Sequence, residues 1–246
     1  MKVSAKGTDA ASKQPRAMPW RAGTLMAEMT VAGVAAHSLV TLGTPRAYGG
    51  GETMIMAGAT DTFVLLLLDG FAKVTAVDAT GVDVLVDIRA AGDVVGELAA
   101  FDGAPRTASV TAVHRVSARR ISQREWIGWF TGARDAELAV HRSLAYRSRV
   151  SVFRRLELFQ GPIAARLARA VMHLGAQYGE QVTEGLLVRP GLTQPEWAEL
   201  IGGKERSVQK ALSRFSEAGA VSRSRGRLII RSESALAAFA AECGGD

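Results

Sequence analysis

The sequence predicts an α+β protein in which a domain of short strands is followed by one long helix and a small, mainly helical domain. Between about residues 40 and 121, short apolar runs rich in β-branched residues alternate with glycine turns about ten residues apart. Residues 134–160 contain neither Gly nor Pro and suit a single long helix. Beyond them, Gly and Pro separate shorter helical segments. This order predicts two domains joined by a helix.

The composition is that of a globular protein with an anionic partner. Hydrophobic residues make up 48% of the 246 residues, and the net charge of +6 favours nucleic acid or an anionic surface as the partner. The one cysteine, Cys243, excludes an internal disulfide, a cysteine zinc site and a four-cysteine iron–sulfur cluster. Since a reducing compartment suits such a chain, we predict a cytoplasmic protein.

No segment has the pattern of a membrane span or a signal peptide. The longest apolar run, residues 63–68, is far too short to cross a bilayer, and the basic N-terminus lacks an apolar core. We predict a disordered basic tail, a strand-rich domain, a long helix and a C-terminal domain. Their predicted bounds are residues 1–22, 23–132, 133–160 and 161–246.

The strand-rich domain is predicted to be a β-barrel or sandwich of the jelly-roll kind. Many short strands separated by glycine turns are typical of both architectures. In residues 83–89, alternate positions face opposite sides of a strand, although Leu85 breaks strict alternation. No sequence period repeats along the chain, which argues against a repeat array.

The long helix carries one seam in which apolar and polar residues are mixed. Its positions lie three, four or seven residues apart: Leu138, His141, Ala145, Ser148, Val152 and Phe159. Such a seam is often a dimer interface, but a helix packed on its own barrel would show the same spacing. Both interpretations stay open, and each could hold for a different face.

Residues 160–162 are predicted to be the hinge between the domains. Pro162 cannot continue the preceding helix but suits the first turn of the next one. We expect a helix from about residue 162 to 178, with Gly179 as its C-terminal stop. A looped segment is expected to lead from there to Gly191.

The next stretch has the pattern of a winged helix-turn-helix. Thr193 and Glu196 form a capping box at the start of a short helix. Ala198, Gly202 and Val208 then supply the small residue, the turn glycine and the branched apolar residue that let a second helix, from about residue 204 to 217, pack closely on the first. Apolar runs around residues 223–227 predict a β-hairpin wing with a basic tip.

The start of that second helix is predicted to enter the major groove of DNA. Residues 192–231 contain eight Lys or Arg against four acidic residues. A solvated basic face is the alternative. The candidate DNA-binding residues are Thr193, Lys204, Glu205, Arg206, Ser207, Gln209, Lys210 and Arg225.

A second candidate site lies in residues 92–110, where a strand, a short helical turn, a loop and another strand are expected. Amides at the start of a helical turn attract an anion, and Arg106 adds a charged donor pair for a phosphate. Thr107 offers a hydroxyl beside it, and Glu97 can accept from a sugar hydroxyl. An ordinary Glu97–Arg106 salt bridge is the alternative, and the residues alone do not separate the two.

Residues 96–99 (Gly-Glu-Leu-Ala) and 104–108 (Ala-Pro-Arg-Thr-Ala) resemble the phosphate-binding cassette of cyclic-nucleotide-binding domains. With the long helix and the winged helix-turn-helix, the chain looks like the cyclic-AMP receptor protein and fumarate–nitrate regulator (Crp/Fnr) superfamily of bacterial transcription factors. The resemblance covers about residues 24–239. It implies a homodimer that binds a cyclic nucleotide and a palindromic DNA operator, with RNA polymerase as a further candidate partner.

The resemblance also implies roles for single residues. Glu97 would bind the ribose 2′-hydroxyl and Arg106 the cyclic phosphate. The amides of Gly96 and Leu98 and the Thr107 hydroxyl would complete the pocket. In the family, residues of the long helix also reach the base, and their spacing indicates Arg147 and Ser151 here. Cyclic AMP is favoured and cyclic GMP stays open, since a hydroxyl after the cassette arginine occurs with either nucleotide.

Two departures from the family limit what can be transferred. Many relatives begin the recognition helix with Ser/Thr-Arg-Glu-Thr/Ser-Val, whereas this chain has Lys-Glu-Arg-Ser-Val at 204–208, so the arginine moves about 100° around the helix. The operator of known members therefore does not carry over. Oxygen sensing through a cysteine-ligated cluster is excluded, and the four histidines form no recognisable haem pair.

The sequence predicts a ligand-driven switch and no enzyme. No nucleophile–base pair, metal cluster or Gly-x-x-x-x-Gly-Lys loop is present. We expect the nucleotide to sit between barrel and long helix and to set the spacing of two recognition helices, about 34 Å apart on DNA. One alternative is a DNA-binding regulator with a vestigial pocket that needs no nucleotide. Another is a winged domain that binds protein instead of DNA.

Overall fold

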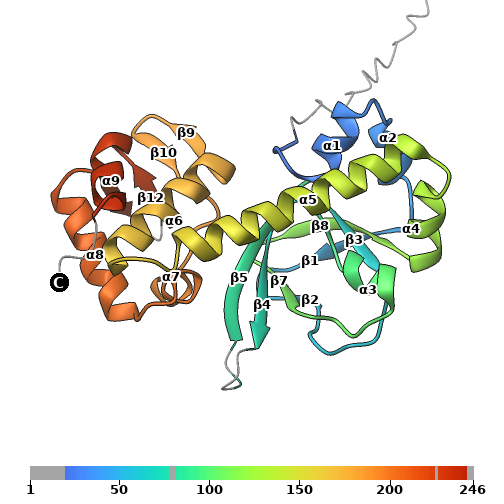
Figure 1. The fold of residues 1–246 in the computed structure, drawn as a ribbon, viewed down its shortest axis with the longest axis horizontal. Helices are drawn as coiled ribbons and strands as arrows, with labels where there is room; N and C mark the ends of the chain where they lie inside the picture. Colours follow the sequence, from blue (N-terminus) through green and yellow to red (C-terminus); the bar gives the residue numbers. More distant parts are fainter. Residues whose placement is uncertain (1–19, 78–80, 82, 225–226, 243–246) are drawn as a thin grey trace, which may run out of the picture.

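The computed structural model describes residues 20–77, 81, 83–224 and 227–242. The predicted N-terminal tail lies almost wholly outside these residues, and Arg225 lies outside them as well. Figure 1 shows an elongated molecule in which the long helix α5 (Arg134–Glu157) runs from the strand-rich domain to the helical C-terminal domain.

The N-terminal domain consists of two four-stranded antiparallel sheets. The first has the order β1 (Thr44–Tyr48), β8 (Val116–Ile121), β3 (Val64–Asp69) and β6 (Val94–Val95). The second has the order β2 (Thr53–Ile55), β7 (Ser109–Ala112), β4 (Phe71–Val77) and β5 (Asp83–Ala90). One apolar core draws side chains from both sheets, which is the jelly-roll arrangement that the strand pattern predicts.

The broken alternation at Leu85 has a structural cause. The pairing of β4 with β5 jumps from Asp87, opposite Val74, to Leu85, opposite Thr75. Val86 is therefore the extra residue of a β-bulge, and it is exposed while Leu85 and Ile88 are buried. The bulge turns Asp87 toward the long helix, where its carboxylate pairs with Arg154.

Four short helices cover the first sheet, and the sequence analysis anticipated only one of them, the helical turn within residues 92–110. They are α1 (Leu25–Val31), α2 (Ala36–Val40), α3 (Glu97–Asp102) and α4 (Gln123–Phe130). Trp126 of α4 and Met26 of α1 are fully buried in a core that also includes Val64 and Leu66 of β3. Burial of such side chains stabilises a domain by roughly 1.5–3 kcal/mol each, so these helices belong to the fold.

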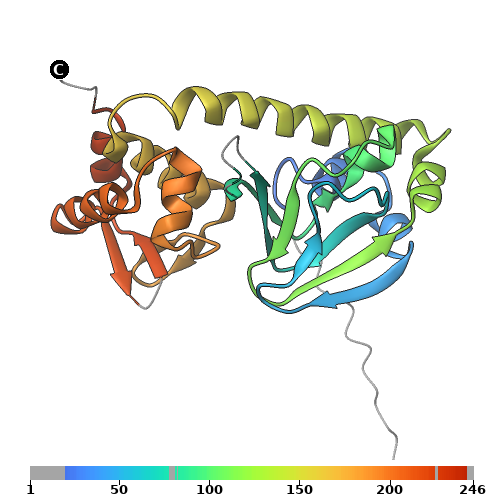
Figure 2. The same ribbon diagram turned by 90° about the horizontal axis from the view of Figure 1, so that it is seen from below.

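Helix α5 has two different faces. Ala139, Val140 and Ser143 are buried against the N-terminal domain. The predicted seam points away from it: Leu138 is 40% exposed, Val152 58% and Phe159 54%. Figure 2 shows the helix lying along one side of both domains with its outer face free in this single chain. Packing on the barrel and an outward seam thus belong to different faces, as the sequence left open.

The C-terminal domain begins with α6 (Ile163–Tyr178) after the turn at Gly161, where φ is +83°. The loop predicted between Gly179 and Gly191 is wrong in part, because β9 (Glu180–Val182) and β10 (Gly185–Leu187) form a hairpin there. These strands are too short to give a periodic signal. Next come α7 (Gln194–Ile201), α8 (Glu205–Glu217), β11 (Val221–Ser224), β12 (Arg227–Ile230) and α9 (Glu233–Ala240). The sheet order is β11-β12-β10-β9.

The two domains share apolar and polar contacts along β5. Leu85 and Ile88 join the core of the C-terminal domain. The Tyr178 hydroxyl donates to the Ile88 carbonyl at 3.0 Å, and the Leu85 amide donates to Glu199 Oε2 of α7 at 3.1 Å. No helix among the described residues combines the length and the apolar character needed to cross a membrane.

His173 on α6 predicts a pH dependence of stability. Burial, reinforced by the nearby Arg154 and partly offset by Asp87, lowers the pKa of His173 from 6.5 to about 4. The folded state then binds fewer protons than the unfolded chain between these values, so stability present above pH 6.5 is lost as the pH falls toward 4. We expect His173→Asn to reduce this loss of unfolding free energy by roughly 1–2 kcal/mol, a value that allows for partial exposure of the ring. Urea unfolding at a series of pH values measures it. An identical pH profile in both proteins would contradict this assignment.

Candidate functional site

The predicted cassette folds around a glycine that opens helix α3. Gly96 has φ +83°, and a Cβ atom there would lie 2.5 Å from Arg106 Nη1 and 2.9 Å from the Phe63 carbonyl oxygen. Only glycine combines this backbone conformation with so close an approach. At the other end of the helix, Gly103 has φ +70°, but a Cβ atom there would have no neighbour within 4 Å.

These two glycines make a matched pair for mutation. Gly103→Ala should cost only the left-handed backbone penalty, about 1–2 kcal/mol of unfolding free energy. Gly96→Ala should cost at least about 1 kcal/mol more, because Arg106 must move and its hydrogen bond to Gly96 strains. Chemical denaturation of both variants checks the difference. Equal losses would show that the contact at Gly96 is unimportant.

Arg106 is 5% exposed and its guanidinium is surrounded by acceptors. Nε and Nη2 donate to Asp61 Oδ1 at 2.8 and 2.5 Å, Nη1 donates to the Gly96 carbonyl at 2.6 Å, and Nη2 donates to the Phe63 carbonyl at 2.6 Å. These bonds use four of the five N–H donors of the side chain. The guanidinium carbon of Arg106 also lies 4.9 Å from the centre of the Phe63 ring. Arg106, the residue predicted to bind the anion, is thus held rigidly but already has a carboxylate partner.

Glu97 pairs with the long helix rather than with Arg106. Its carboxylate is buried and accepts from Arg147 Nη1 at 2.8 Å. Arg147 Nη2 also donates to the Val94 carbonyl at 2.6 Å and lies 3.5 Å from Asp93 Oδ1. The alternative of a Glu97–Arg106 salt bridge is therefore wrong for this structure. The two groups have separate partners.

One cavity brings all the predicted ligand residues together. It has a volume of about 630 Å³ and lies between the cassette, the second sheet and α5. Its lining includes Gly96, Glu97, Leu98, Arg106, Thr107, Arg147 and Ser151. Leu98, Thr107 and Ser151 are exposed, so they lie at the open side. The volume is within the usual range for a small-molecule site.

Sequence reasoning missed the acidic partner of Arg106 and the apolar wall of the cavity. Asp61 is 45 positions from Arg106, and a lone acidic residue before a strand carries no signal of that pairing. The apolar wall, formed by Ile55, Val74 and Val95 among others, comes from strand positions that face inward. Alternation within β4 could have indicated part of it, but only once the two sheets were placed face to face.

The helix-turn-helix geometry agrees with the sequence pattern. The Thr193 amide donates to Glu196 Oε2 at 2.7 Å, and the Glu196 amide donates to Thr193 Oγ1 at 3.5 Å, which closes the capping box. Gly202 ends α7 with φ +60°, and Ala198 and Val208 are buried between the helices. The turn and the packing residues thus lie where the triplet predicts them.

The candidate DNA-binding side chains mostly face solvent. Lys204, Glu205, Arg206, Gln209 and Lys210 are exposed around the start of α8, while Ser207 is half-buried. Thr193 is exposed at the cap of α7. The hairpin of β11 and β12 forms the predicted wing, with Ser224 opposite Arg227. The tip residue Arg225 lies outside the described residues, so its placement stays a prediction.

Two family profiles match the chain in the order of its domains. The cyclic nucleotide-binding domain profile matches residues 45–130, and the Crp-like helix-turn-helix domain profile matches residues 165–239. The chain belongs to the Crp/Fnr superfamily of transcription regulators. This family regulates transcription rather than catalysing a reaction, in agreement with the sequence analysis.

Individual relatives support the same assignment. A CRP-like cAMP-activated global transcriptional regulator of Mycobacterium tuberculosis is 28% identical over 184 residues, which are 75% of this chain and 82% of that protein. A CRP-family regulator of Thermus thermophilus has a TM-score of 0.69 at 21% identity, covering 80% of this chain and 97% of its own. A CooA mutant of Carboxydothermus hydrogenoformans has a TM-score of 0.69 at 16% identity, covering 89% and 96%. These structures establish the fold of this Crp/Fnr regulator.

Proposed function

We propose that this Crp/Fnr regulator is a homodimer that binds a cyclic nucleotide, with cyclic AMP favoured, and thereby changes its affinity for DNA. One observation carries the proposal: the seven predicted ligand residues line a single cavity between the cassette and α5. The M. tuberculosis relative is named as cAMP-activated, which favours cyclic AMP over cyclic GMP.

Binding of the phosphate requires an exchange of anions at Arg106. Because the guanidinium is almost saturated, a phosphate can form two bonds to it only by displacing an acceptor. Asp61 is the acceptor most easily displaced, since its side chain is 45% exposed while Arg106 is buried. The two carbonyl acceptors belong to fixed backbone. The nucleotide phosphate would therefore replace the Asp61 carboxylate and leave the guanidinium in place.

The ribose contact would come from Glu97 of the cassette and the base contacts from α5. Glu97 would bind the ribose hydroxyl while Arg147 holds its other oxygen. Ser151 lies one turn further along the same helix and faces the cavity. A nucleotide in this position contacts both the cassette and α5, so it can bias how the long helices pair. The ligand shifts that balance only by its difference in affinity for the two arrangements.

The exposed seam of α5 supports the dimer. Leu138, Val152 and Leu156 are each at least 40% exposed on the face turned away from the barrel, and Phe159, just beyond the end of the helix, is 54% exposed. Pairing two such seams would bury them and would carry two recognition helices to one DNA duplex, about 34 Å apart. The wing and the exposed start of α8 would then contact phosphates and bases. The cytoplasm stays the predicted location, and RNA polymerase stays a predicted partner.

A second candidate is a regulator whose pocket no longer needs a nucleotide. The Asp61–Arg106 ion pair favours it, because the protein already supplies the charge that a phosphate would bring. Calorimetric titration of the purified protein with cyclic AMP and cyclic GMP separates the two. Heat of binding for either nucleotide, with a change in DNA affinity, supports the sensor. If neither nucleotide gives heat of binding at millimolar concentration, the regulator with a vestigial pocket is favoured.

A further inference from the structure

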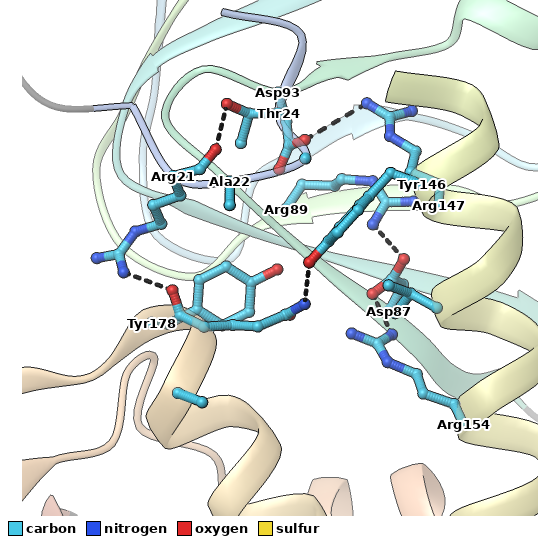
Figure 3. A pocket seen from close by; sticks show the side chains of 14 residues that line it. Arg21, Ala22, Thr24, Asp87, Arg89, Asp93, Tyr146, Arg147, Arg154 and Tyr178 are labelled. Carbon is cyan, nitrogen blue, oxygen red and sulfur yellow. Dashed lines mark hydrogen bonds and ion pairs between the residues drawn. The ribbon is translucent and has the colours of Figure 1, made fainter. Parts of the chain in front are cut away.

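A second cavity lies between the two domains. It has a volume of about 450 Å³ and is lined by the segment before α1, by β5, by α5 and by the C-terminal end of α6. Figure 3 shows Arg21 and Tyr178 on one side of it and a column of charged side chains beside α5 on the other. It is distinct from the cassette cavity, although Asp87, Arg89 and Arg147 line both.

The lining of this interdomain cavity carries more positive than negative charge. Four arginines (21, 89, 147 and 154) face two aspartates (87 and 93), which leaves a formal charge of +2. Asp87 is shared, because both Arg89 and Arg154 pair with its carboxylate. Arg147 makes its shorter ion pair with Glu97, outside this cavity, and lies 3.5 Å from Asp93. With Glu97 counted, three carboxylates stand against four guanidiniums, so one positive charge is left unbalanced.

Arg21 shows this imbalance most clearly. Its Nη1 donates to the Gln177 carbonyl at 2.7 Å, and its guanidinium carbon lies 5.5 Å from the Tyr178 ring centre. Within the described part of the chain, no carboxylate lies within ion-pairing distance of it. Burial lowers the pKa of this arginine, which reflects the cost of a cation removed from water. An anion in the cavity would offset that cost.

Asp93 adds to the positive surplus. It is buried, and burial raises the pKa of its carboxyl above the usual value. Of the two aspartates it therefore loses its charge more readily when an anion approaches. Asp87 has a lowered pKa because Arg89 and Arg154 oppose the effect of burial. If Asp93 takes up a proton and becomes neutral, it repels an anion that enters the cavity only weakly.

We propose that the interdomain cavity binds a small molecule through a phosphate group, at a site separate from the cassette. Several guanidiniums from different elements suit a phosphate, because its oxygens accept from more than one donor pair while a monocarboxylate offers a single edge. Tyr146, Gln177 and Tyr178 are among the uncharged residues of the wall. Gln177 Oε1 is buried and has no hydrogen-bond partner among the described residues; as an acceptor it suits a hydroxyl of the ligand and not its phosphate.

The site would be coupled to the cassette through Arg147. This side chain lines both cavities and holds Glu97, the residue expected to bind ribose. A phosphate that draws Arg147 away from Glu97 changes the affinity of the cassette for nucleotide. By linkage, the nucleotide must change the affinity for the phosphate ligand by the same factor.

The test measures binding of inorganic pyrophosphate to the full chain by calorimetry, without cyclic nucleotide and at constant ionic strength. We expect saturable binding that Arg21→Gln weakens by at least about tenfold, or 1.4 kcal/mol. Arg124→Gln removes the same charge from the exposed face of α4 and should leave the affinity unchanged. Arg21 is suitable because it lines the interdomain cavity and does not line the cassette cavity.

Further arms separate this proposal from the nucleotide sensor. Arg106→Leu should remove cyclic-nucleotide binding and keep pyrophosphate binding, and Arg154→Gln should repeat the effect of Arg21→Gln if the latter unfolds. The proposal is overturned if wild-type protein shows no saturable binding, if the Arg21 and Arg124 variants bind alike, or if Arg106→Leu abolishes the signal. Equal binding of citrate would overturn the choice of phosphate.

Discussion

Replacing Arg106 by leucine is expected to weaken cyclic-nucleotide binding by more than a hundredfold, about 3 kcal/mol, while the protein stays folded. The side chain is buried and fixed by two backbone carbonyls, so its guanidinium is already positioned for the phosphate. The fold tolerates its loss because Asp61, the partner left behind, is half-exposed and can be hydrated. Calorimetry with cyclic AMP and thermal unfolding check the two parts. Retained micromolar affinity in a folded variant would refute the proposed pocket.

Asp61→Asn is the matched control for this prediction, and its effect has the opposite sign. The asparagine keeps an acceptor for Arg106 but removes the charge that competes with the phosphate. Nucleotide affinity should therefore rise, by roughly tenfold if displacement of the carboxylate is the main cost. A fall in affinity would mean that Asp61 positions the guanidinium and is not displaced. In that case the exchange of anions is wrong even if Arg106 binds the ligand.

Replacing Arg206 by alanine should reduce binding to the specific operator by about 1–3 kcal/mol and binding to random DNA by much less. Arg206 is exposed near the start of α8, the end that enters the major groove in helix-turn-helix proteins. Operator affinity, measured against random duplex at several salt concentrations, separates a base contact from a phosphate contact. A uniform loss with a salt slope smaller by about one would assign Arg206 to the backbone.

Arg214→Ala provides the control on the same helix. Arg214 lies near the C-terminal end of α8, where Nη2 pairs with Glu242 Oε1 at 2.9 Å. It carries the same charge as Arg206 but is directed to the body of its own domain. We expect operator affinity to change little. A loss equal to that of Arg206→Ala would show that the overall charge of the domain governs binding.

The helix-turn-helix could be predicted almost completely, because its determinants are local. Thr193 and Glu196 are three residues apart, and Gly202 is required by a left-handed turn next to them. The cassette was recognisable for the same reason, since Gly96, Glu97 and Arg106 lie within eleven positions. The family profiles agree with both assignments.

Contacts between distant parts of the chain could not be predicted. Asp61 meets Arg106 because the segment after β2 runs beside the segment before β7, where Arg106 exchanges backbone hydrogen bonds with Gly58 and Ala59. No local pattern encodes that pairing. The hairpin of β9 and β10 could not be predicted, because strands of three residues are too short to show an alternating pattern. The interdomain arginines come from the N-terminal segment, β5 and α5, so their convergence depends on the whole fold.

The way β5 is shared gives this regulator a property beyond ligand binding. Leu85, Ile88 and Ala90 belong to the apolar core of the C-terminal domain, although their strand is part of the N-terminal one. Cutting the chain at the Gly161 turn would expose these apolar side chains on the N-terminal fragment. It would also leave the core of the C-terminal fragment incomplete. Neither half is thus a free-standing module, and a chimaera with a relative's winged domain would fold well only if the strand's outer residues were exchanged along with it.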